Sequence, residues 1–280
     1  MIGAVGDLVE DVAVRLGGPV HVASDTDAVI TRRRGGSAAN VVAAAGRLGS
    51  AARFIGQVGA DAAGDRLIEA LMSCGVEIVG RRGGRTGTVV AIVDSSGERT
   101  MLSDRGAATE LSDPDMAWAA GLGALHVPLY SLAVEPLAGT SMQLASAART
   151  AGAMVSVDAS SVGVLDRLGH DAVLAVLAAV APDVVLVNQD EAAWFGGRLA
   201  EGVPLTVVKH GPRPAVVFRR GEPPVEVPAL ALERVPDTTG AGDAFAAGFL
   251  VASLAGADPE TAAAAGHQSA AAHLTTIEVL

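Results

Sequence analysis

Residues 183–188 read Asp183-Val184-Val185-Leu186-Val187-Asn188, a run of four apolar residues that ends in an amide. Two further runs have the same form: Ala153-Met154-Val155-Ser156-Val157 leads into Asp158, and Leu205-Thr206-Val207-Val208 leads into Lys209. Strands that are apolar along their length are typical of a parallel sheet covered on both faces, because neither face meets water. The runs therefore predict buried, parallel strands.

Alanine-rich segments with helical spacing lie between such runs. They cover residues 37–49, 61–74, 135–150, 241–256 and 259–273. Strand followed by helix, repeated along the chain, predicts a doubly wound α/β fold. Ligands of such sheets bind beyond the carboxyl ends of the strands, so Asp158, Asn188 and Lys209 become candidate site residues.

Two regions, residues 9–34 and 86–103, depart from this alternation. In the second, apolar and β-branched stretches flank Asp94-Ser95-Ser96-Gly97, which predicts a β-hairpin with a short glycine-containing turn. Hairpins outside the main sheet imply a small separate sheet that could act as a lid. Because no Pro-, Gly- or Ser-rich linker divides the chain, we predict one domain over residues 1–280 with lid strands from 9–34 and 86–103.

The composition limits the classes of function. The 280 residues carry a formal charge of −11, which disfavours a nucleic-acid partner because such surfaces are basic. Cys74 is the only cysteine, so the sequence offers no intrachain disulfide and no thiolate zinc cluster. No apolar run is long enough to span a bilayer, and no leader-like segment follows Met1. These features predict a cytoplasmic protein without a nucleic-acid or membrane partner.

The segment most indicative of chemistry is Asp237-Thr238-Thr239-Gly240-Ala241-Gly242-Asp243, which precedes an apolar helical stretch. A glycine turn at a helix start presents backbone N–H groups and the positive end of the helix dipole, which suits a phosphoryl group. Asp243 would lie in the first helical turn, where its carboxylate can accept a proton from an attacking hydroxyl. A purely structural turn fits the same spacing. A dinucleotide fingerprint does not, because Phe245 stands where glycine or alanine is needed.

A second glycine turn, Gly35-Gly36-Ser37-Ala38-Ala39-Asn40, also precedes a helical stretch. It places Asn40 one turn into the helix, where the amide can hydrogen-bond a hydroxyl group. The alternative is a helix cap packed closely on the sheet. We call residues 35–40 the N-terminal glycine turn and residues 237–243 the C-terminal glycine turn.

Four segments in order resemble the signatures of the ribokinase or PfkB family of carbohydrate kinases. The stretch 35–49 is similar to the first family signature and 237–248 to the second. Residues 54–64 are similar to the family's strand-to-helix segment, and Asn188-Gln189-Asp190-Glu191 resembles its Asn-x-x-Glu motif. The resemblance runs from about residue 3 to residue 273 and implies a three-layer α/β/α (ribokinase-like) fold, with a mostly parallel central sheet and a small β-sheet lid.

The resemblance implies that the chain uses ATP to phosphorylate a hydroxyl of a sugar or sugar acid. Asp243 would be the general base, and the backbone of Gly240, Ala241 and Gly242 would form the anion hole. The nucleotide side is implied to include Asn188 and Glu191, which would organise Mg²⁺ through water, and Lys209 and Gly211 near the phosphates. Taken without the resemblance, Glu191 could equally be an exposed helical carboxylate and Lys209 a surface lysine.

On the acceptor side, Asp11 is similar to the family aspartate that binds sugar hydroxyls, with Gly36 and Asn40 beside it. Asp7 and Glu10 are close enough in sequence to compete with Asp11 for this role. The lid arginines Arg99 and Arg105 could pair with an acidic group of the substrate, or simply lie on the surface.

A nucleoside acceptor is an alternative, and the absence of aromatic residues from the lid segments argues against it. A catalytically silent binding protein is the other alternative, against which the intact Asp243 turn argues.

Some residues depart from the family pattern. Ala159-Ser160-Ser161 follows Asp158 where many relatives have proline, asparagine and arginine nearby, and Pro212 replaces a common second glycine.

The resemblance allows K⁺ at a monovalent-cation site that includes Asp237 and Thr239. The exposed edge of the lid sheet predicts a homodimer, because uncovered strands invite pairing.

Overall fold

The computed structural model describes residues 1–94, 99–197, 199–233, 235 and 237–276, so the turn of the hairpin expected at 86–103 lies outside the described residues. Its strands fall into two sheets. The larger sheet contains β1 (Ile2–Val5), β4 (Ala52–Val58), β5 (Val76–Arg82), β8 (Ala124–Pro128), β9 (Met154–Asp158), β10 (Val184–Asn188), β11 (Leu205–His210), β12 (Arg213–Arg219) and β13 (Val225–Val227). The smaller contains β2 (Val9–Leu16), β3 (Ala28–Gly35), β6 (Thr86–Val93) and β7 (Arg99–Gly106).

The larger sheet has the order β13-β12-β11-β10-β9-β8-β1-β4-β5 in the described part of the chain. Neighbouring strands are parallel from β11 to β5, and only the β11/β12 and β12/β13 pairs are antiparallel. The first four residues of β10 are buried, as expected for a strand that is covered on both faces.

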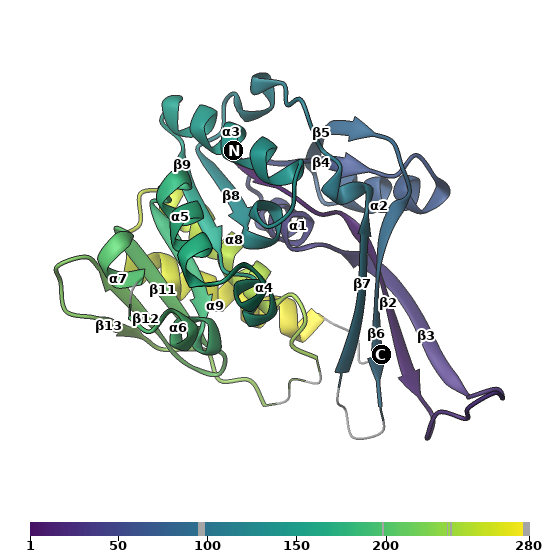
Figure 1. Ribbon diagram of the computed structural model, residues 1–280. Coiled ribbons are helices and arrows are strands. Elements are labelled where there is room, and N and C mark those ends of the chain that lie inside the picture. The colour runs from purple at the N-terminus through teal and green to yellow at the C-terminus, as the bar shows by residue number, and fades with distance from the viewer. Residues whose placement is uncertain (95–98, 198, 234, 236, 277–280) are drawn as a thin grey trace.

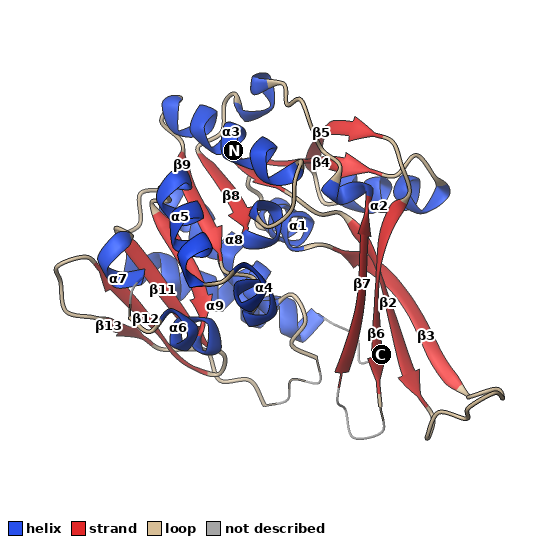
Figure 2. Ribbon diagram, viewed as in Figure 1, coloured by secondary structure: helices blue, strands red, loops and turns tan. Residues whose placement is uncertain are grey.

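Helices cover both faces of this sheet, as Figure 2 shows. They are α1 (Ser37–Arg47), α2 (Ala62–Met72), α3 (Leu137–Thr150), α4 (Val162–Leu168), α5 (His170–Val180), α6 (Gln189–Phe195), α7 (Leu199–Gly202), α8 (Ala241–Leu254) and α9 (Pro259–Thr276). One apolar cluster packs α1, α2, α8 and α9 on one face, and a second packs α3, α4, α5 and α6 on the other. This three-layer arrangement, with its mostly parallel sheet and a smaller second sheet, confirms the predicted fold class.

The five helices expected from spacing are all present, with ends that differ by at most three residues. The helices α4, α5, α6 and α7 were absent from that expectation. Two of these, α4 and α6, have only seven residues each, so their apolar pattern spans about two turns. Their starts are instead fixed by side-chain caps from Ser161 and Asn188.

The smaller sheet projects beyond the helices in Figure 1. Its order is β3-β2-β6-β7, antiparallel except for the β2/β6 pair. Asp11 on β2 lies opposite Arg33 on β3 and Val89 on β6. Because β3 ends at Gly35 and α1 begins at Ser37, the N-terminal glycine turn connects the smaller sheet directly to α1, which packs against the larger sheet.

None of the helices in the described part of the chain is both long and apolar enough to cross a membrane.

Candidate active site

The C-terminal glycine turn begins helix α8. Gly240 has a φ of 78°, in the left-handed region that favours glycine, and a Cβ there would lie 2.9 Å from Nε2 of His273. The same His273 nitrogen lies 2.9 Å from the carbonyl oxygen of Thr239. The turn is further held by Ala241, whose N–H donates to the carbonyl oxygen of Thr238 at 3.2 Å. Backbone conformation and the α9 histidine thus fix the start of α8.

Asp243, in the first turn of α8, receives two hydrogen bonds from the first turn of α1. The hydroxyl of Ser37 donates to its carboxylate at 2.6 Å, and the Nδ2 amide of Asn40 donates at 2.9 Å. Burial raises the pKa of Asp243, although these two hydrogen bonds oppose that change. The two glycine turns, 203 residues apart between Asn40 and Asp243, therefore meet at one carboxylate.

Asn40 also connects Asp243 to the smaller sheet. Its Oδ1 accepts a hydrogen bond from the guanidinium of Arg34 at 2.8 Å. The amide is thus oriented on both sides, with its oxygen toward the cation and its nitrogen toward the carboxylate. Arg34 did not emerge from the sequence as a site residue, since a run of three arginines on a strand carries no motif.

The carboxyl ends of β9, β10 and β11 bring Asp158, Asn188 and Lys209 to one edge of the larger sheet. The ammonium of Lys209 lies 2.6 Å from a carboxylate oxygen of Asp158, and both side chains are largely buried. Burial lowers the pKa of Lys209, but the Asp158 carboxylate, together with those of Glu191 and Asp243, raises it above its ordinary value. A Cβ on Gly242 would lie 3.4 Å from this ammonium, so Lys209 faces the C-terminal glycine turn. The interpretation as a surface lysine is wrong.

Glu191 forms a capping box with Asn188 at the start of α6. Its carboxylate accepts from the backbone N–H of Asn188 at 2.7 Å and from the side-chain amide at 2.8 Å, while its own N–H donates to Asn188 Oδ1. The side chain is only 2% exposed, so it is not an exposed helical carboxylate. Burial, reinforced by Asp158, raises the pKa of Glu191 to about 7.

The three acidic residues before and within β2 have different partners. Asp7 accepts two hydrogen bonds from Arg105, each at 2.7 Å. Glu10 pairs with Arg32 at 2.7 Å and with a second arginine from α2. Asp11 makes no hydrogen bond to any described residue, and burial raises its pKa to about 6 in spite of Arg33. Of the three, Asp11 is the carboxylate whose acceptors remain open to a ligand.

A cavity of about 670 Å³ lies over the C-terminal glycine turn, and we call it the turn cavity. Its polar lining includes Asp158, Asn188, Glu191, Lys209, Gly211 and residues 240–243; its apolar lining includes Ala229, Leu230, Leu232, Phe245, Ala270 and Leu274, with His267 also present. The volume falls in the range of about 300–1,000 Å³ that is usual for ligand pockets. A ligand with both an anionic part and an apolar part matches this lining.

A second cavity, of about 640 Å³, lies between β3, α1 and the end of α9, and we call it the arginine cavity. It is lined by Asp11, Thr31, Arg32, Arg33, Arg34, Asn40, Ala44, Arg47, Ala70, Ser73, Cys74, Thr239, Gly240, Ala244, His273 and Thr276. Gly240 lines both cavities. Because Asn40 lies in the second cavity and its partner Asp243 in the first, the Asp243 carboxylate stands where the two meet.

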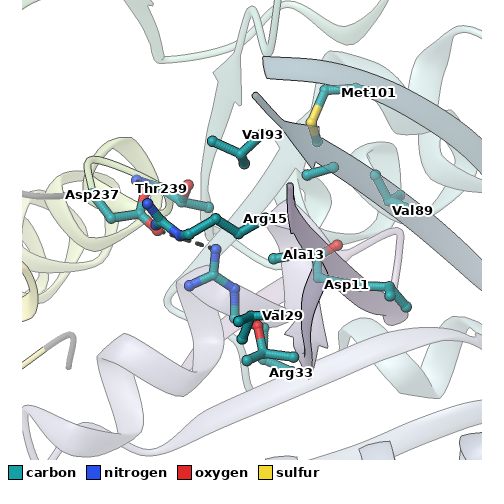
Figure 3. Close-up of a pocket in the computed structure, with 13 residues that line it drawn as sticks. Asp11, Ala13, Arg15, Val29, Arg33, Val89, Val93, Met101, Asp237 and Thr239 are labelled. Atoms are coloured by element: carbon teal, nitrogen blue, oxygen red, sulfur yellow. Dashed lines mark hydrogen bonds and ion pairs between the residues drawn. The ribbon is translucent and has the colours of Figure 1, made fainter. Parts of the chain in front are cut away.

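Figure 3 shows a smaller space against one face of the smaller sheet, where Arg33 extends from β3 toward Asp237, while Asp11 on β2 and Thr239 also line the space. The guanidinium of Arg33 lies 3.3 Å from the carboxylate of Asp237, whose other oxygen accepts from the backbone N–H of Thr239 at 2.8 Å. The smaller sheet and the C-terminal glycine turn are thus joined by an ion pair.

The structure brings together Asp11, Gly36, Asn40, Gly240, Ala241, Gly242, Asp243, Asn188, Glu191, Lys209 and Gly211 around the two connected cavities. Arg105 lies apart from both linings and is engaged with Asp7 and with the ring of Tyr130, 5.9 Å from its guanidinium carbon. Two further site residues, Ser37 and His273, were not predicted from the sequence. Ser37 could have been found, because it directly follows the glycine pair, whereas no motif surrounds His273.

Among the described residues, no group of three or more His, Cys, Asp or Glu side chains is arranged to hold a metal ion. The donor set therefore fits Mg²⁺ only through water. Each Glu191 oxygen already accepts one hydrogen bond, which leaves one lone pair on each for a metal-bound water.

Comparison with known proteins agrees with this architecture. Residues 4–279 match the family model described as pfkB family carbohydrate kinase. An ATP-dependent ribose-1-phosphate kinase from Halopiger xanaduensis is 34% identical over 253 residues, which cover 85% of this chain and 80% of that protein. A fructokinase from Klebsiella pneumoniae is 32% identical, with coverage of 88% and 85%.

Among solved structures, adenosine kinase from Sinorhizobium meliloti superposes with a TM-score of 0.88 at 24% identity, over 99% of this chain and 94% of that one. This likeness concerns the fold. The family match, by contrast, extends over nearly the whole chain, and it is accompanied by relatives above 30% identity with high mutual coverage. The chain belongs to the pfkB family of carbohydrate kinases and is a phosphotransferase with an alcohol group as acceptor.

Proposed function

We propose that this kinase transfers the γ-phosphoryl group of ATP to a hydroxyl of a sugar or sugar acid, with Asp243 as the general base. The observation that carries the proposal is the position of the Asp243 carboxylate, at the junction of the turn cavity and the arginine cavity. An acceptor hydroxyl from one side and a phosphoryl group from the other would meet beside this carboxylate.

ATP would occupy the turn cavity, with adenine against its apolar lining near His267 and the phosphates beside Lys209 and the C-terminal glycine turn. The backbone N–H groups of Gly240 and Gly242 and the start of α8 would face the transferred phosphoryl group. The N–H of Ala241, already bonded to Thr238, would contribute less. Lys209, beside Gly242, would supply a positive charge to the phosphates. Magnesium, held through water by Glu191 and Asn188, would supply charge neutralisation when bound.

The Asp243 carboxylate would take the hydroxyl proton as the new bond forms, because an aspartate is too weak a base to ionise an alcohol beforehand. Ser37 and Asn40 would hold the carboxylate in place through their hydrogen bonds. Asp11, whose acceptors are open, would bind the acceptor's other hydroxyls beside Gly36 and Asn40. Asp237 and Thr239 would be the contacts for K⁺ if a monovalent cation supports the turn, although Arg33 already pairs with Asp237.

The acceptor class can be tested by measuring ADP formation with neutral sugars, sugar acids, sugar phosphates and nucleosides at fixed MgATP. We expect turnover that depends on a sugar-like acceptor. The relatives are named for a sugar phosphate and for a neutral sugar, and the structural neighbour for a nucleoside. Turnover with nucleosides alone would favour the nucleoside-kinase alternative. No acceptor-dependent turnover at all would favour a silent binding protein.

We also propose that the chain forms a cytoplasmic homodimer through the outer face of the smaller sheet. Ile30 and Leu102, 58% and 54% exposed, lie on this face, which is opposite the space drawn in Figure 3, together with the half-buried Val14 and Val90. Contiguous apolar side chains on a sheet favour burial against a second copy. Sedimentation velocity at micromolar concentration is expected to give a dimer, and Ile30→Lys with Leu102→Lys should give a monomer. A monomeric wild-type protein at those concentrations would contradict this proposal.

A further inference from the structure

The arginine cavity concentrates positive charge in a protein of net charge −11. Arg32, Arg33, Arg34 and Arg47 line it, and Asp11 is the only carboxylate among the described residues of the lining. Neutral sugars are bound mainly through hydroxyls, which need both donors and acceptors. A lining with four guanidinium groups and one carboxylate instead resembles a site for an anion.

The four arginines differ in how their charges are compensated. Arg32 pairs with Glu10, and Arg33 pairs with Asp237. Arg34 donates to the neutral amide of Asn40, and Arg47 makes no ion pair or hydrogen bond to the residues that the structure describes. Burial and the neighbouring Arg47 lower the pKa of Arg34, which means that its charge is held at a cost. Two nearby guanidinium groups therefore lack a bonded carboxylate.

The position of these two arginines relates them to the reacting carboxylate. Asn40, Ala44 and Arg47 are spaced by four and three residues, so they share one face of α1, and all three line the cavity. At 1.5 Å per residue, Asn40 and Arg47 are about 10 Å apart along the helix. The long side chain of Arg47 can bring its guanidinium group closer to Asn40 than this distance between the two backbone positions. A five- or six-carbon acceptor that binds beside Asn40 could therefore place its far end near Arg34 and Arg47.

We propose that the acceptor carries an anionic group, a phosphate or a carboxylate, at the end away from the reacting hydroxyl, and that Arg34 and Arg47 bind it. This inference rests on the proposed kinase function and narrows its substrate class. Planar guanidinium groups bind both kinds of anion through paired N–H donors, so the shared chemistry is an anionic oxygen pair.

Arg47→Met tests the proposal with little risk to folding, because Arg47 is exposed at the end of α1 and has no partner to lose. Steady-state kinetics would use matched acceptors: an aldopentose with its phosphate, and a hexose with its hexonic acid. We expect the wild-type enzyme to prefer a charged member of a pair. We expect Arg47→Met to raise the KM for that member about 10- to 100-fold, with kcat retained, because a charge-assisted hydrogen bond is lost.

Arg167→Met is the matched control, since Arg167 is also exposed in the last turn of a helix but lies in neither cavity. It should leave both KM values unchanged. A preference for the phosphate identifies a sugar phosphate, and a preference for the hexonic acid identifies a sugar acid; either result supports the proposal.

Efficient turnover of the neutral members, with equal effects of Arg47→Met on both, would overturn this inference while leaving the kinase function intact. A change confined to the KM for ATP would overturn it as well, since the cavity would then serve the nucleotide. No turnover with any member would overturn the inference together with the proposed function.

Discussion

Replacing Asp243 with asparagine is expected to lower kcat about 10²- to 10⁴-fold, the range of general acid–base contributions. Asparagine keeps the shape of the side chain but cannot take the proton of the acceptor hydroxyl. The nucleotide would still find Lys209 and the backbone of the turn, so the Kd for ATP should change little. The measurement is acceptor-dependent ADP formation, with ATP affinity determined separately by titration.

The pH profile adds a second readout. Burial raises the pKa of Asp243, and a base must be ionised to act. Activity of the wild-type enzyme should therefore fall with decreasing pH at values above those of an ordinary aspartate. This acid limb should be absent from the residual activity of Asp243→Asn.

Asp65→Asn is a suitable control, because Asp65 also lies in the first turn of a helix but has only an exposed ion pair with Arg82. Such surface pairs contribute about 0–1 kcal/mol. The control should keep wild-type kinetics and thermal stability. If Asp243→Asn phosphorylates the acceptor at the wild-type rate, Asp243 is not the base.

The fold was accessible from the sequence because the strands that form its centre are short, apolar and followed by helices. Burial on both faces forces the first four residues of β10 to be apolar, and this pattern can be recognised in the sequence alone. Short helices such as α4 and α6 leave little periodicity, since their starts depend on single capping residues. The positions of these two helices are thus determined by capping hydrogen bonds rather than by a repeating apolar pattern.

The site residues could be predicted from the sequence only where the backbone geometry requires a particular residue type. Gly36, at a φ of 98°, leaves no room for a Cβ against the carbonyl oxygen of Asp7, and Gly240 is constrained similarly by His273. Arg34 reaches Asn40 because β3 enters α1 through this turn, and Lys209 reaches Asp158 because parallel strands align their ends. Both contacts depend on tertiary arrangement, for which a single sequence gives no spacing rule.

Lys209→Met is the second change with a large expected effect, here on stability. The ammonium of Lys209 neutralises Asp158 at 2.6 Å, and both side chains are largely buried. Glu191 and Asp243 lie close enough for Asp158 to raise the pKa of each. Removing the lysine leaves three neighbouring carboxylates without their cation. Breaking a buried pair in this way costs about 3–5 kcal/mol, or roughly 5–9 °C in Tm for a chain of this size.

The loss should depend on pH in a defined direction. Carboxylates whose pKa is raised in the folded state favour folding when protonated, so their stabilisation is present at low pH and lost as pH rises through the raised value. Glu191, with a pKa of about 7, already behaves in this way. The difference in Tm between Lys209→Met and the wild-type protein should thus be small at pH 5 and large at pH 8.

Asp158→Asn provides the matched comparison. Lys209 then keeps two carboxylates nearby, since Glu191 and Asp243 both favour its charged form. This variant should lose less stability than Lys209→Met, and adding it to Lys209→Met should recover part of the loss, because one of the repelling charges is removed. The KM for ATP should rise in both variants that lack Lys209, since the ammonium beside Gly242 is absent. Equal losses for the two single variants, or a Tm difference independent of pH, would show that charge compensation by Lys209 does not hold this edge of the sheet together.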